Sequence, residues 1–388
     1  MKKYNRVCAT IDMDAVAYNV EQMLKNIKSG TSMLVVIKAD GYGHGAVPIA
    51  AMLEKESYIW GFAVATLDEG VVLRKHGITK PILVLGCIFP DQYQEMLEHD
   101  IRMTVYTKEM AETVSQLAVK EGKKAYFHIK LDTGMGRLGF SIKEESVQTI
   151  KQINEMPNIC MEGIFTHFAT ADDADKKFTM DQLEAYSWVV DRLQELGVTF
   201  SYRHCSNSAG IIDIKEANFD MVRAGISTYG MYPSEEVIKN NVALKPALTL
   251  TSHIAFVKAV EAGTPISYGS TFVASEHMLV ATIPVGYADG YARSLSGKGY
   301  VLIRGQRANI IGRICMDQFM VDVTAIKDVS FGDEVTLIGR NGDEVLPVEV
   351  LSDISGRFNY EFVCCLSKRI PREYSYHGKI EEQIDYFK

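Results

Sequence analysis

The sequence predicts an α/β fold, a (β/α)8 TIM-type barrel followed by a mainly β C-terminal domain. Three observations support this prediction. Over the first 230 or so residues, short apolar runs alternate with amphipathic segments of helical period, as in a parallel sheet with helical crossovers. After about residue 244 the helical period almost vanishes and β-rich runs follow one another. Polar side chains gather where the predicted strands end, which is where barrel enzymes keep their active sites.

The barrel half contains eight candidate strands, at residues 33–38, 60–66, 81–87, 102–107, 125–132, 160–168, 201–206 and 220–224. Amphipathic helices are expected between them, for example at 67–76, 108–121, 143–153 and 178–196. Most of these segments end at a glycine or a proline, as helices commonly do. Eight strand and helix units favour a closed barrel, with a doubly wound open sheet as the alternative.

The second half is predicted to be a mainly β domain. Its β-rich runs lie at 247–260, 278–286, 300–304, 308–323 and 334–338, and we expect a further strand at 360–367. The predicted domains are therefore residues 1–244 and residues 245–388. We leave open that the first ten or so residues pair with the second domain.

Composition excludes several classes of function. The chain has 388 residues, a formal net charge of -8 and a pI near 5.7, which leaves no basic surface for nucleic acid and no polybasic stretch for a membrane. No apolar run approaches the ~18 residues of a spanning helix, so we expect a cytoplasmic protein.

The cysteine and histidine patterns predict neither a disulfide framework nor a metal site. The seven cysteines are scattered without a CxxC pair, and the histidines include no HExxH motif. We expect most of the cysteines to be small core residues.

Lys38 is the first candidate catalytic residue. It ends the apolar run 33–37 and precedes the glycine-rich segment 39–45. Apolar surroundings disfavour the charged form of a lysine and lower its pKa, which makes the neutral amine a nucleophile able to form a Schiff base with an aldehyde. Taken alone, Lys38 is more simply interpreted as a solvated residue at the end of a strand.

Further polar groups follow the other strands: Lys130 with Asp132, then His167, then Ser206, Asn207 and Ser208, then Arg223. In the strand 125–132, the two-residue period places His128, Lys130 and Asp132 on one face. A polar face in a strand that is buried on both sides requires a reason.

The loops after strands seven and eight commonly hold a phosphate in this architecture. Here they offer the hydroxyls of Ser206 and Ser208 and the backbone amides of Gly225 and Ile226. The segment 206–208 is equally well interpreted as a helix N-cap. A lysine together with a phosphate cradle suggests a phosphorylated aldehyde, which among cofactors means pyridoxal 5'-phosphate.

The sequence resembles the alanine racemases, and the similarity extends over both predicted domains with the motifs in family order. The matching segments are Val36 to Gly45, Lys130 to Gly139, Thr166 to Phe168, Asn207 and Ser208, Val222 to Ile226, Ile266 to Gly269, Gly286 to Gly290, Ile314 to Asp317, and Asn359 to Glu361.

The resemblance implies a pyridoxal-phosphate enzyme of barrel type that interconverts L- and D-alanine and supplies D-alanine for peptidoglycan. Racemisation needs an electron sink and a base on each face of the planar intermediate. By the resemblance, Lys38 serves the D-side face. Tyr268, from the other subunit, serves the L-side face.

The resemblance also places His167 beside Tyr268, and Arg223 beyond it. A tyrosine near its reference pKa of ~10 is a poor base at neutral pH, so a cationic neighbour must favour the phenolate. Arg223 is further expected to donate a hydrogen bond to the pyridine nitrogen and keep it unprotonated, which weakens the electron sink. A purely structural pairing of His167 with Arg223 is the alternative.

The remaining roles come from the same resemblance. Arg137 is expected near the cofactor phenolic oxygen or the substrate carboxylate, supported by Lys130, which the family carbamylates. Tyr42 and Tyr360 are expected to bind the phosphate with Ser208, Gly225 and Ile226. Met316 and Asp317 of the partner chain are expected to bound the substrate pocket. Tyr287 and Arg293 are expected to line its entrance. Without the resemblance, packing and turn formation would be the simpler interpretation for Tyr42, Tyr360, Met316 and Asp317.

Because the two bases would come from different chains, we expect a head-to-tail homodimer with two composite sites. Three alternatives remain open. The first is a racemase for serine or for a broader range of amino acids. The second is a decarboxylase on the same barrel, against which Arg223 argues. The third is a non-catalytic pyridoxal-phosphate-binding protein, which leaves the chain after residue 244 unexplained.

Overall fold

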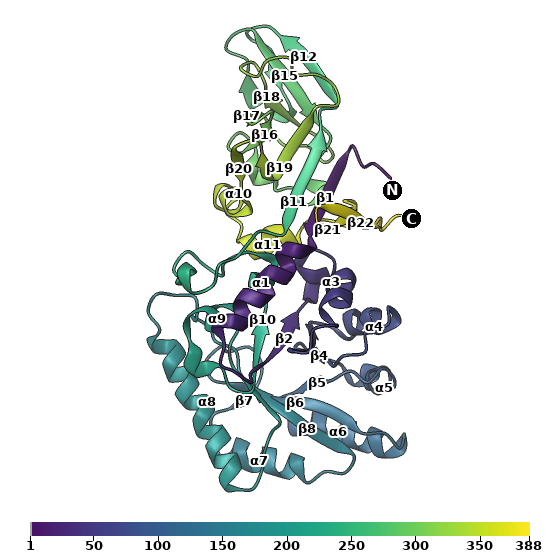
Figure 1. The fold of residues 1–388 in the computed structure, drawn as a ribbon, viewed down its shortest axis with the longest axis vertical. Helices are drawn as coiled ribbons and strands as arrows, with labels where there is room; N and C mark the ends of the chain where they lie inside the picture. Colours follow the sequence, from purple (N-terminus) through teal and green to yellow (C-terminus); the bar gives the residue numbers. More distant parts are fainter. Residues whose placement is uncertain (1) are drawn as a thin grey trace. The chain divides into compact units, whose positions relative to one another are not determined.

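The computed structural model describes residues 2–388 of the chain. It divides into two compact units (Figure 1). The barrel unit consists of Ala15–Gly41 and Ala46–Pro246. The β unit consists of the residues up to Asp14, Tyr42–Gly45 and Ala247–Lys388.

Within residues 2–388, eight parallel strands form the barrel: β2 (Ser32–Val36), β3 (Ile59–Val64), β4 (Ile82–Val84), β5 (Met103–Val105), β6 (Ala125–Asp132), β8 (Ile159–Phe165), β9 (Tyr202–His204) and β10 (Met221–Ala224). They make two ladders, in the orders β10-β2-β3-β4 and β5-β6-β8-β9, and β7 (Phe140–Ser141) pairs with the end of β6. A parallel bridge between Leu83 and Arg102 joins β4 to β5. The Arg223 amide, which donates to the Ser206 carbonyl at 2.9 Å, joins β10 to the end of β9. The predicted (β/α)8 barrel is therefore confirmed, and the open-sheet alternative is wrong.

Helices connect these strands: α1 (Met13–Asn26), α3 (Ala46–Leu53), α4 (Leu67–Lys75), α5 (Tyr93–Glu98), α6 (Lys108–Lys120), α7 (Glu144–Asn154), α8 (Lys177–Glu195) and α9 (Ser208–Asp213). The longer ones form because one face is apolar and buried, whereas the short helix α9 is buried along most of its length. In α6, for example, Ala111, Val114 and Ala118 are buried at helical spacing. The Thr107 side chain caps the first turn of α6 by accepting from the Met110 amide.

Polar side chains occupy part of the barrel interior, where bulky aliphatic groups are usual. His128 and Lys130 on β6, His204 on β9 and Arg223 on β10 are at most 4% exposed. On the polar face predicted for the strand 125–132, His128 and Lys130 are thus buried and require partners inside the barrel, whereas Asp132 is half-buried.

The β unit is built on one large sheet with the strand order β12-β15-β18-β17-β16-β19-β11-β1-β21-β22. Its strands are β1 (Val7–Asp12), β11 (Leu248–His253), β12 (Phe256–Val260), β15 (Met278–Ile283), β16 (Tyr300–Ile303), β17 (Gln306–Ile311), β18 (Phe319–Asp322), β19 (Glu334–Asn341), β20 (Glu344–Leu346), β21 (Arg372–Tyr376) and β22 (Lys379–Ile384). The N-terminal strand β1 pairs antiparallel with β11 and parallel with β21. A short hairpin, β13 (Pro265–Ile266) with β14 (Phe272–Val273), lies beside a small apolar cluster that includes Val260 and Val280.

The strand expected at residues 360–367 is wrong. The structure has α11 (Asn359–Cys364) there, preceded by α10 (Val348–Ser355). The buried residues Asn359, Phe362, Val363 and Leu366 recur at helical spacing. This period outweighs the β propensity of the valine and cysteines that suggested a strand.

The expectation that most cysteines lie in the core is also wrong. Cys8 and Cys205 are buried, whereas Cys87, Cys364 and Cys365 are exposed. The last two are exposed because they lie on the outer face at the end of α11.

Across residues 2–388, no helix combines the length and the apolar character that crossing a membrane requires.

Candidate active site

Lys38 lies just beyond the carboxyl end of β2, in the turn Lys38–Tyr42. The backbone of this turn is left-handed at Ala39, Asp40 and Gly41, with φ of 51°, 52° and 61°. Two of these residues carry a Cβ, so the conformation costs on the order of 1 kcal/mol or more at each. Strain of this kind persists where surrounding contacts enforce it, and it is often found at functional sites.

Glu69 supplies such contacts. Its Oε1 accepts from the Ala39 amide at 2.6 Å, and its Oε2 accepts from the Ala65 amide at 2.7 Å. Glu69 and Thr66 also form a capping box at the start of α4. One carboxylate therefore joins the turn that carries Lys38 to the loop after β3. The sequence analysis did not single out Glu69, although the Thr-x-x-Glu spacing before an apolar run signals a capping box.

Arg223 lies at the centre of the buried polar groups. Among the described residues, its two terminal nitrogens donate to five acceptors, and none of these acceptors is anionic: His204 Nδ1 (3.0 Å), His167 Nδ1 (3.2 Å) and the carbonyls of His204, Thr166 and Cys205. Burial lowers the pKa of Arg223 to about 10, a value at which the guanidinium stays charged at neutral pH. The site thus contains a buried cation held by neutral groups.

His167 follows β8 and accepts a hydrogen bond from Arg223 through Nδ1. Arginine has only donors, so Nδ1 carries no proton and neutral His167 holds its proton on Nε2. Burial, and then the positive charge of Arg223, lower the pKa of His167 well below its ordinary value. The predicted proximity of His167 and Arg223 is confirmed, whereas their catalytic roles stay predictions.

Lys130 lies on β6 with its side chain almost fully buried and its Nζ donating to the Leu131 carbonyl. Burial, followed by repulsion from Arg223, lowers the pKa of Lys130 to about 8. The exposed Arg137 acts on Lys130 in the same direction, and Asp132 opposes it.

The end of the barrel that carries these groups is electropositive. Arg223, Arg137, Lys130 and Lys38 all act to lower the pKa of His167. Asp132 is engaged locally, since its Oδ1 accepts from the amides of the glycine turn that follows. Groups of this sign suit an anionic ligand such as a phosphate ester.

The segment after β9 caps a helix and contacts the loop after β10. Asn207 is the N-cap of α9, with its side chain accepting from the Gly210 amide at 3.0 Å. The Ser208 hydroxyl accepts from the amides of Gly225 (3.1 Å) and Ser227 (3.3 Å), so the predicted cradle residues are neighbours. The Ser206 hydroxyl instead donates to Asn218 Oδ1 at 2.9 Å, so this hydroxyl is not part of the cradle.

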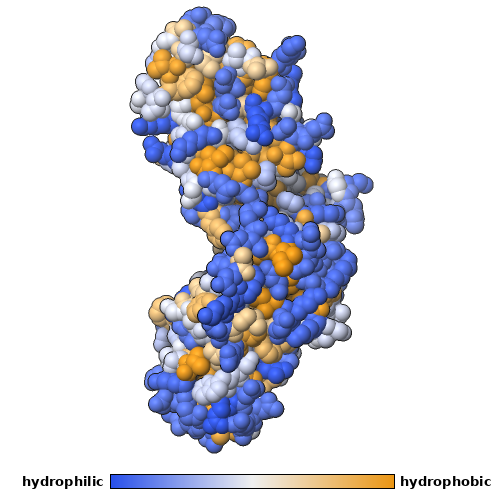
Figure 2. Space-filling view, turned by 90° about the vertical axis from the view of Figure 1, so that its left-hand side faces the viewer, coloured by the Kyte–Doolittle hydropathy of each residue, from blue (hydrophilic) through white to orange (hydrophobic). Residues whose placement is uncertain are grey.

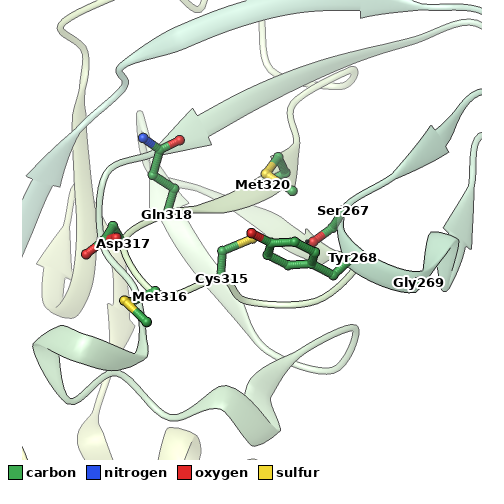
Figure 3. A pocket seen from close by; sticks show the side chains of 8 residues that line it. All are labelled: Ser267, Tyr268, Gly269, Cys315, Met316, Asp317, Gln318 and Met320. Carbon is green, nitrogen blue, oxygen red and sulfur yellow. Dashed lines mark hydrogen bonds between the residues drawn. The ribbon is translucent and has the colours of Figure 1, made fainter.

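The β unit has a separate pocket of about 570 Å³, which Figure 3 shows with its lining side chains. Tyr268 projects into it from a turn in which Ser267 has φ 66°. The Ser267 hydroxyl holds this turn by donating to the Arg313 carbonyl at 2.6 Å. The Tyr268 side chain is 70% exposed, which leaves its phenol accessible from outside its own chain.

The loop of Met316 and Asp317 lines the same pocket. The Tyr287 amide donates to the Cys315 carbonyl at 3.1 Å, so the predicted entrance residue Tyr287 lies beside this loop. Asp317 accepts from Arg369 Nη2 at 2.8 Å, and the sequence analysis missed this support.

Two other predicted residues of the β unit are neighbours, and a third is exposed. The rings of Tyr42 and Tyr360 pack edge to face, with centroids 6.0 Å apart. Arg293 is exposed in the turn η7 (Arg293–Leu295). Each unit therefore brings together its own set of the predicted side chains.

Comparison with protein families gives two matches. The family described as alanine racemase, N-terminal domain, matches residues 11–233, and that described as alanine racemase, C-terminal domain, matches residues 247–374. A curated relative named alanine racemase from Clostridium tetani is 45% identical over 380 residues, with 98% of each chain covered. Another of the same name, from Desulforamulus reducens, is 45% identical over 368 residues, covering 95% of this chain and 98% of its own.

Solved structures agree with these matches. The alanine racemase of Clostridium difficile 630 superposes with a TM-score of 0.96 at 41% identity, covering 99% of this chain and all of its own. The alanine racemase of Bacillus anthracis with bound L-Ala-P superposes with a TM-score of 0.93 at 36% identity, covering all of this chain and 99% of its own.

We predict that Glu69→Ala releases the turn that carries Lys38. The amides of Ala39 and Ala65 lose their acceptor, so the free energy of unfolding should fall by about 1–2 kcal/mol. Hydrogen exchange at the Ala39 amide should become faster. Glu184→Ala, at an exposed position of α8, is the control and should change neither quantity. Unaltered protection of Ala39 in the Glu69 variant would contradict the assignment.

Proposed function

Because the chain belongs to the alanine racemase family, we propose that it interconverts L- and D-alanine with pyridoxal 5'-phosphate as its cofactor, supplying D-alanine for peptidoglycan. The proposal rests on the match over both domains to relatives named alanine racemase, at up to 45% sequence identity. The bound L-Ala-P in the Bacillus anthracis relative supports alanine as the substrate.

A chiral assay tests this function. With pyridoxal phosphate supplied, L-alanine should be converted to an equal mixture of both enantiomers, and D-alanine should give the same mixture. Serine and larger amino acids, supplied in parallel, should react much more slowly. Faster turnover of serine would favour the broader racemase, and no turnover of any amino acid would contradict the proposal.

The barrel unit fits the proposed cofactor. Its cationic end suits a phosphate ester, and the residues that would hold the cofactor are Lys38 through its amine, Arg223 at the ring nitrogen, and Ser208, Gly225 and Ile226 at the phosphate. The Gly225 amide, which donates to the Ser208 hydroxyl, would exchange this acceptor for a phosphate oxygen. From the family resemblance we assign Tyr42 and Tyr360 to the phosphate as well. Among residues 2–388, Arg223 donates its hydrogen bonds through its two terminal nitrogens, so Nε–H would be the donor to the ring nitrogen.

The chemistry follows from the properties of these side chains. Bound pyridoxal phosphate supplies an electron sink that acidifies the Cα proton of the substrate. We assign proton transfer on the D-side face to Lys38 Nζ and on the L-side face to the Tyr268 oxygen. His167 Nε2–H is oriented by Arg223 and is suited to donate to the Tyr268 oxygen. Arg137 binds the substrate carboxylate or the cofactor phenolic oxygen.

We infer a homodimer with shared sites, and the exposure of the β-unit residues supports this inference. Tyr268 is 70% exposed, and Met316 and Tyr287 are 52% and 42% exposed. Scattered hydrophobic patches interrupt a mostly hydrophilic surface in the view of Figure 2. We therefore assign Tyr268, Met316 and Asp317 to the active site of a partner chain, with Tyr287 and Arg293 at its entrance.

We predict that Tyr268→Phe lowers proton abstraction from L-alanine by orders of magnitude and leaves Cα exchange of D-alanine in deuterated water largely intact. The phenylalanine ring keeps the packing but has no oxygen to accept the proton. Deuterium incorporation measured separately from each enantiomer is the readout. Equal loss in both directions would contradict the two-base assignment.

Mixing variants tests the shared site directly. Lys38→Ala and Tyr268→Phe chains, dissociated and reassembled together, should recover about one quarter of the wild-type sites, because half of the dimers are mixed and each has one intact site. Each variant reassembled alone is the control. If each active site were built from a single chain, the mixture of the two variants would recover no activity.

We infer that Lys130 is carbamylated, as the family resemblance indicates. With a pKa of about 8, roughly one tenth of this lysine is neutral at pH 7, compared with well under one per cent for an ordinary lysine. The neutral amine is the form that adds carbon dioxide. The product is an anion, which would replace repulsion toward Arg137 and Arg223 with attraction.

Protein equilibrated with ¹³C-bicarbonate should show a carbamate ¹³C signal that rises from pH 6 to pH 8, as the neutral amine becomes more abundant. The signal should disappear in Lys130→Gln and persist in Lys258→Gln, a change at an exposed strand position. Active protein with no such signal would contradict the carbamate.

The cellular location and the domain boundaries also remain proposals. We infer a cytoplasmic location, because all seven cysteines are free and a reducing compartment preserves them in that state. We also retain residues 1–244 and 245–388 as the two domains, with the first ten or so residues assigned to the second.

A further inference from the structure

A line of buried polar side chains leads away from Arg223 across the strands of the barrel unit. Arg223 Nη1 is 3.0 Å from His204 Nδ1, and His204 Nε2 is 2.8 Å from His128 Nδ1. His128 Nε2 is buried, makes no hydrogen bond within residues 2–388, and lies 3.5 Å from Glu162 Oε2. Arg102 Nε donates to the same carboxylate oxygen at 3.2 Å. The line therefore begins at one arginine and ends at a carboxylate paired with another.

The donor at one end and the carboxylate at the other favour the same proton positions along this line. Arg223 can only donate, so His204 Nδ1 must accept, and a neutral His204 carries its proton on Nε2. That proton points to His128 Nδ1, which must accept in turn. A neutral His128 then carries its proton on Nε2 and needs an acceptor there. An ionised carboxylate only accepts, and Glu162 Oε2, 3.5 Å from His128 Nε2, is positioned to take this role.

The surroundings favour neutral imidazoles and an ionised carboxylate. Burial, followed by the charge of Arg223, lowers the pKa of His204 well below its ordinary value. Burial also lowers the pKa of His128, although Glu162 opposes the shift. For Glu162 itself, burial is outweighed by His128 and Arg102, which together lower the pKa of the carboxyl group.

The neighbouring residues pack closely against the two imidazole rings. Gly163 lies opposite His128 in the pairing of β6 with β8, and a Cβ at this glycine would lie 2.5 Å from His128 Nδ1. Phe165 stacks on His204 with ring centroids 4.8 Å apart and planes 6° from parallel. Trp60 packs on His128 at 5.6 Å. These contacts leave each imidazole little freedom to rotate away from its partners.

The geometry points to Glu162 as a positioning residue for Arg223, acting through His128 and His204 by holding the proton of each imidazole on Nε2. The inference rests on the proposed function in one respect, the contact of Arg223 with the cofactor ring. Glu162 itself touches neither substrate nor cofactor in this assignment.

Removal of the Glu162 carboxylate is expected to reverse the direction of the hydrogen bonds along this line. Arg102 then faces His128 Nε2 without an anion between them, and since Arg102 only donates, His128 must accept at Nε2 and move its proton to Nδ1. His204 must then accept at Nε2 and carry its proton on Nδ1. Two donors, His204 Nδ1–H and Arg223 Nη1–H, would face each other. Arg223 would lose one acceptor and shift its position relative to the ring nitrogen.

Glu162→Gln tests this arrangement in the holoenzyme with ¹⁵N-labelled histidine. The ring-nitrogen signals of wild-type His128 and His204, assigned by their loss in His128→Gln and His204→Gln, should show Nε2–H and bare Nδ1 at both residues. In Glu162→Gln, whose amide can satisfy Arg102 with its oxygen and donate to His128, the pattern should reverse. We expect kcat to fall about tenfold, with KM changing by less than about threefold.

Controls separate this role from ordinary packing. Trp60→Phe keeps an aromatic ring against His128 and should preserve both the nitrogen signals and kcat. Glu162→Asp retains the anion and should recover part of the lost kcat.

A proton on Nδ1 of His128 or His204 in the wild type would overturn the inference, even if Glu162→Gln failed to fold. Unchanged nitrogen signals in a folded Glu162→Gln would also overturn it, as would reversed signals with unchanged kcat. A protein that never racemised alanine would refute the proposed function, whereas the nitrogen signals would still decide the proton positions.

Discussion

A guanidinium buried among neutral acceptors is the constraint on which the rest of the site depends. Arg223 has been moved out of water without a carboxylate partner, which is costly unless hydrogen bonds replace the lost hydration. Its acceptors come from β9 and from the segments after β8 and β9. The arrangement therefore requires a closed barrel with these strands in register. The resulting positive end of the barrel also favours an anionic cofactor.

The two units supply different kinds of chemical group. The barrel unit contributes buried cations on rigid strand ends, where burial shifts their pKa values. The β unit contributes an exposed phenol on a turn of strained backbone, tied to the 313–315 loop through Ser267. The half-buried Lys38 and the exposed Tyr268 are the two groups that we propose as bases on opposite faces of one carbon atom.

Sequence reasoning went wrong where local propensity competed with tertiary packing. Residues 359–366 carry β-forming side chains, yet their buried positions follow a helical period, and α11 forms. Glu69 was overlooked because its importance lies in the backbone of a distant turn that it holds. The sequence predicted only that His128 belongs to a polar face, because its hydrogen-bond partner His204 is 76 positions away in the chain.

The sequence alone determined the alternation of strands and helices, the change to a β-rich second half, and the candidate residues at the strand ends. These features were readable because periodicity and apolar runs are local properties of the chain. The tertiary structure decided which polar side chains share hydrogen bonds, the direction of each donor, and which pKa values shift. Those properties arise from burial and from contacts between residues remote in sequence. Ser206 and Ser208 show the difference: two positions apart, one hydroxyl contacts Asn218 and the other the Gly225 amide.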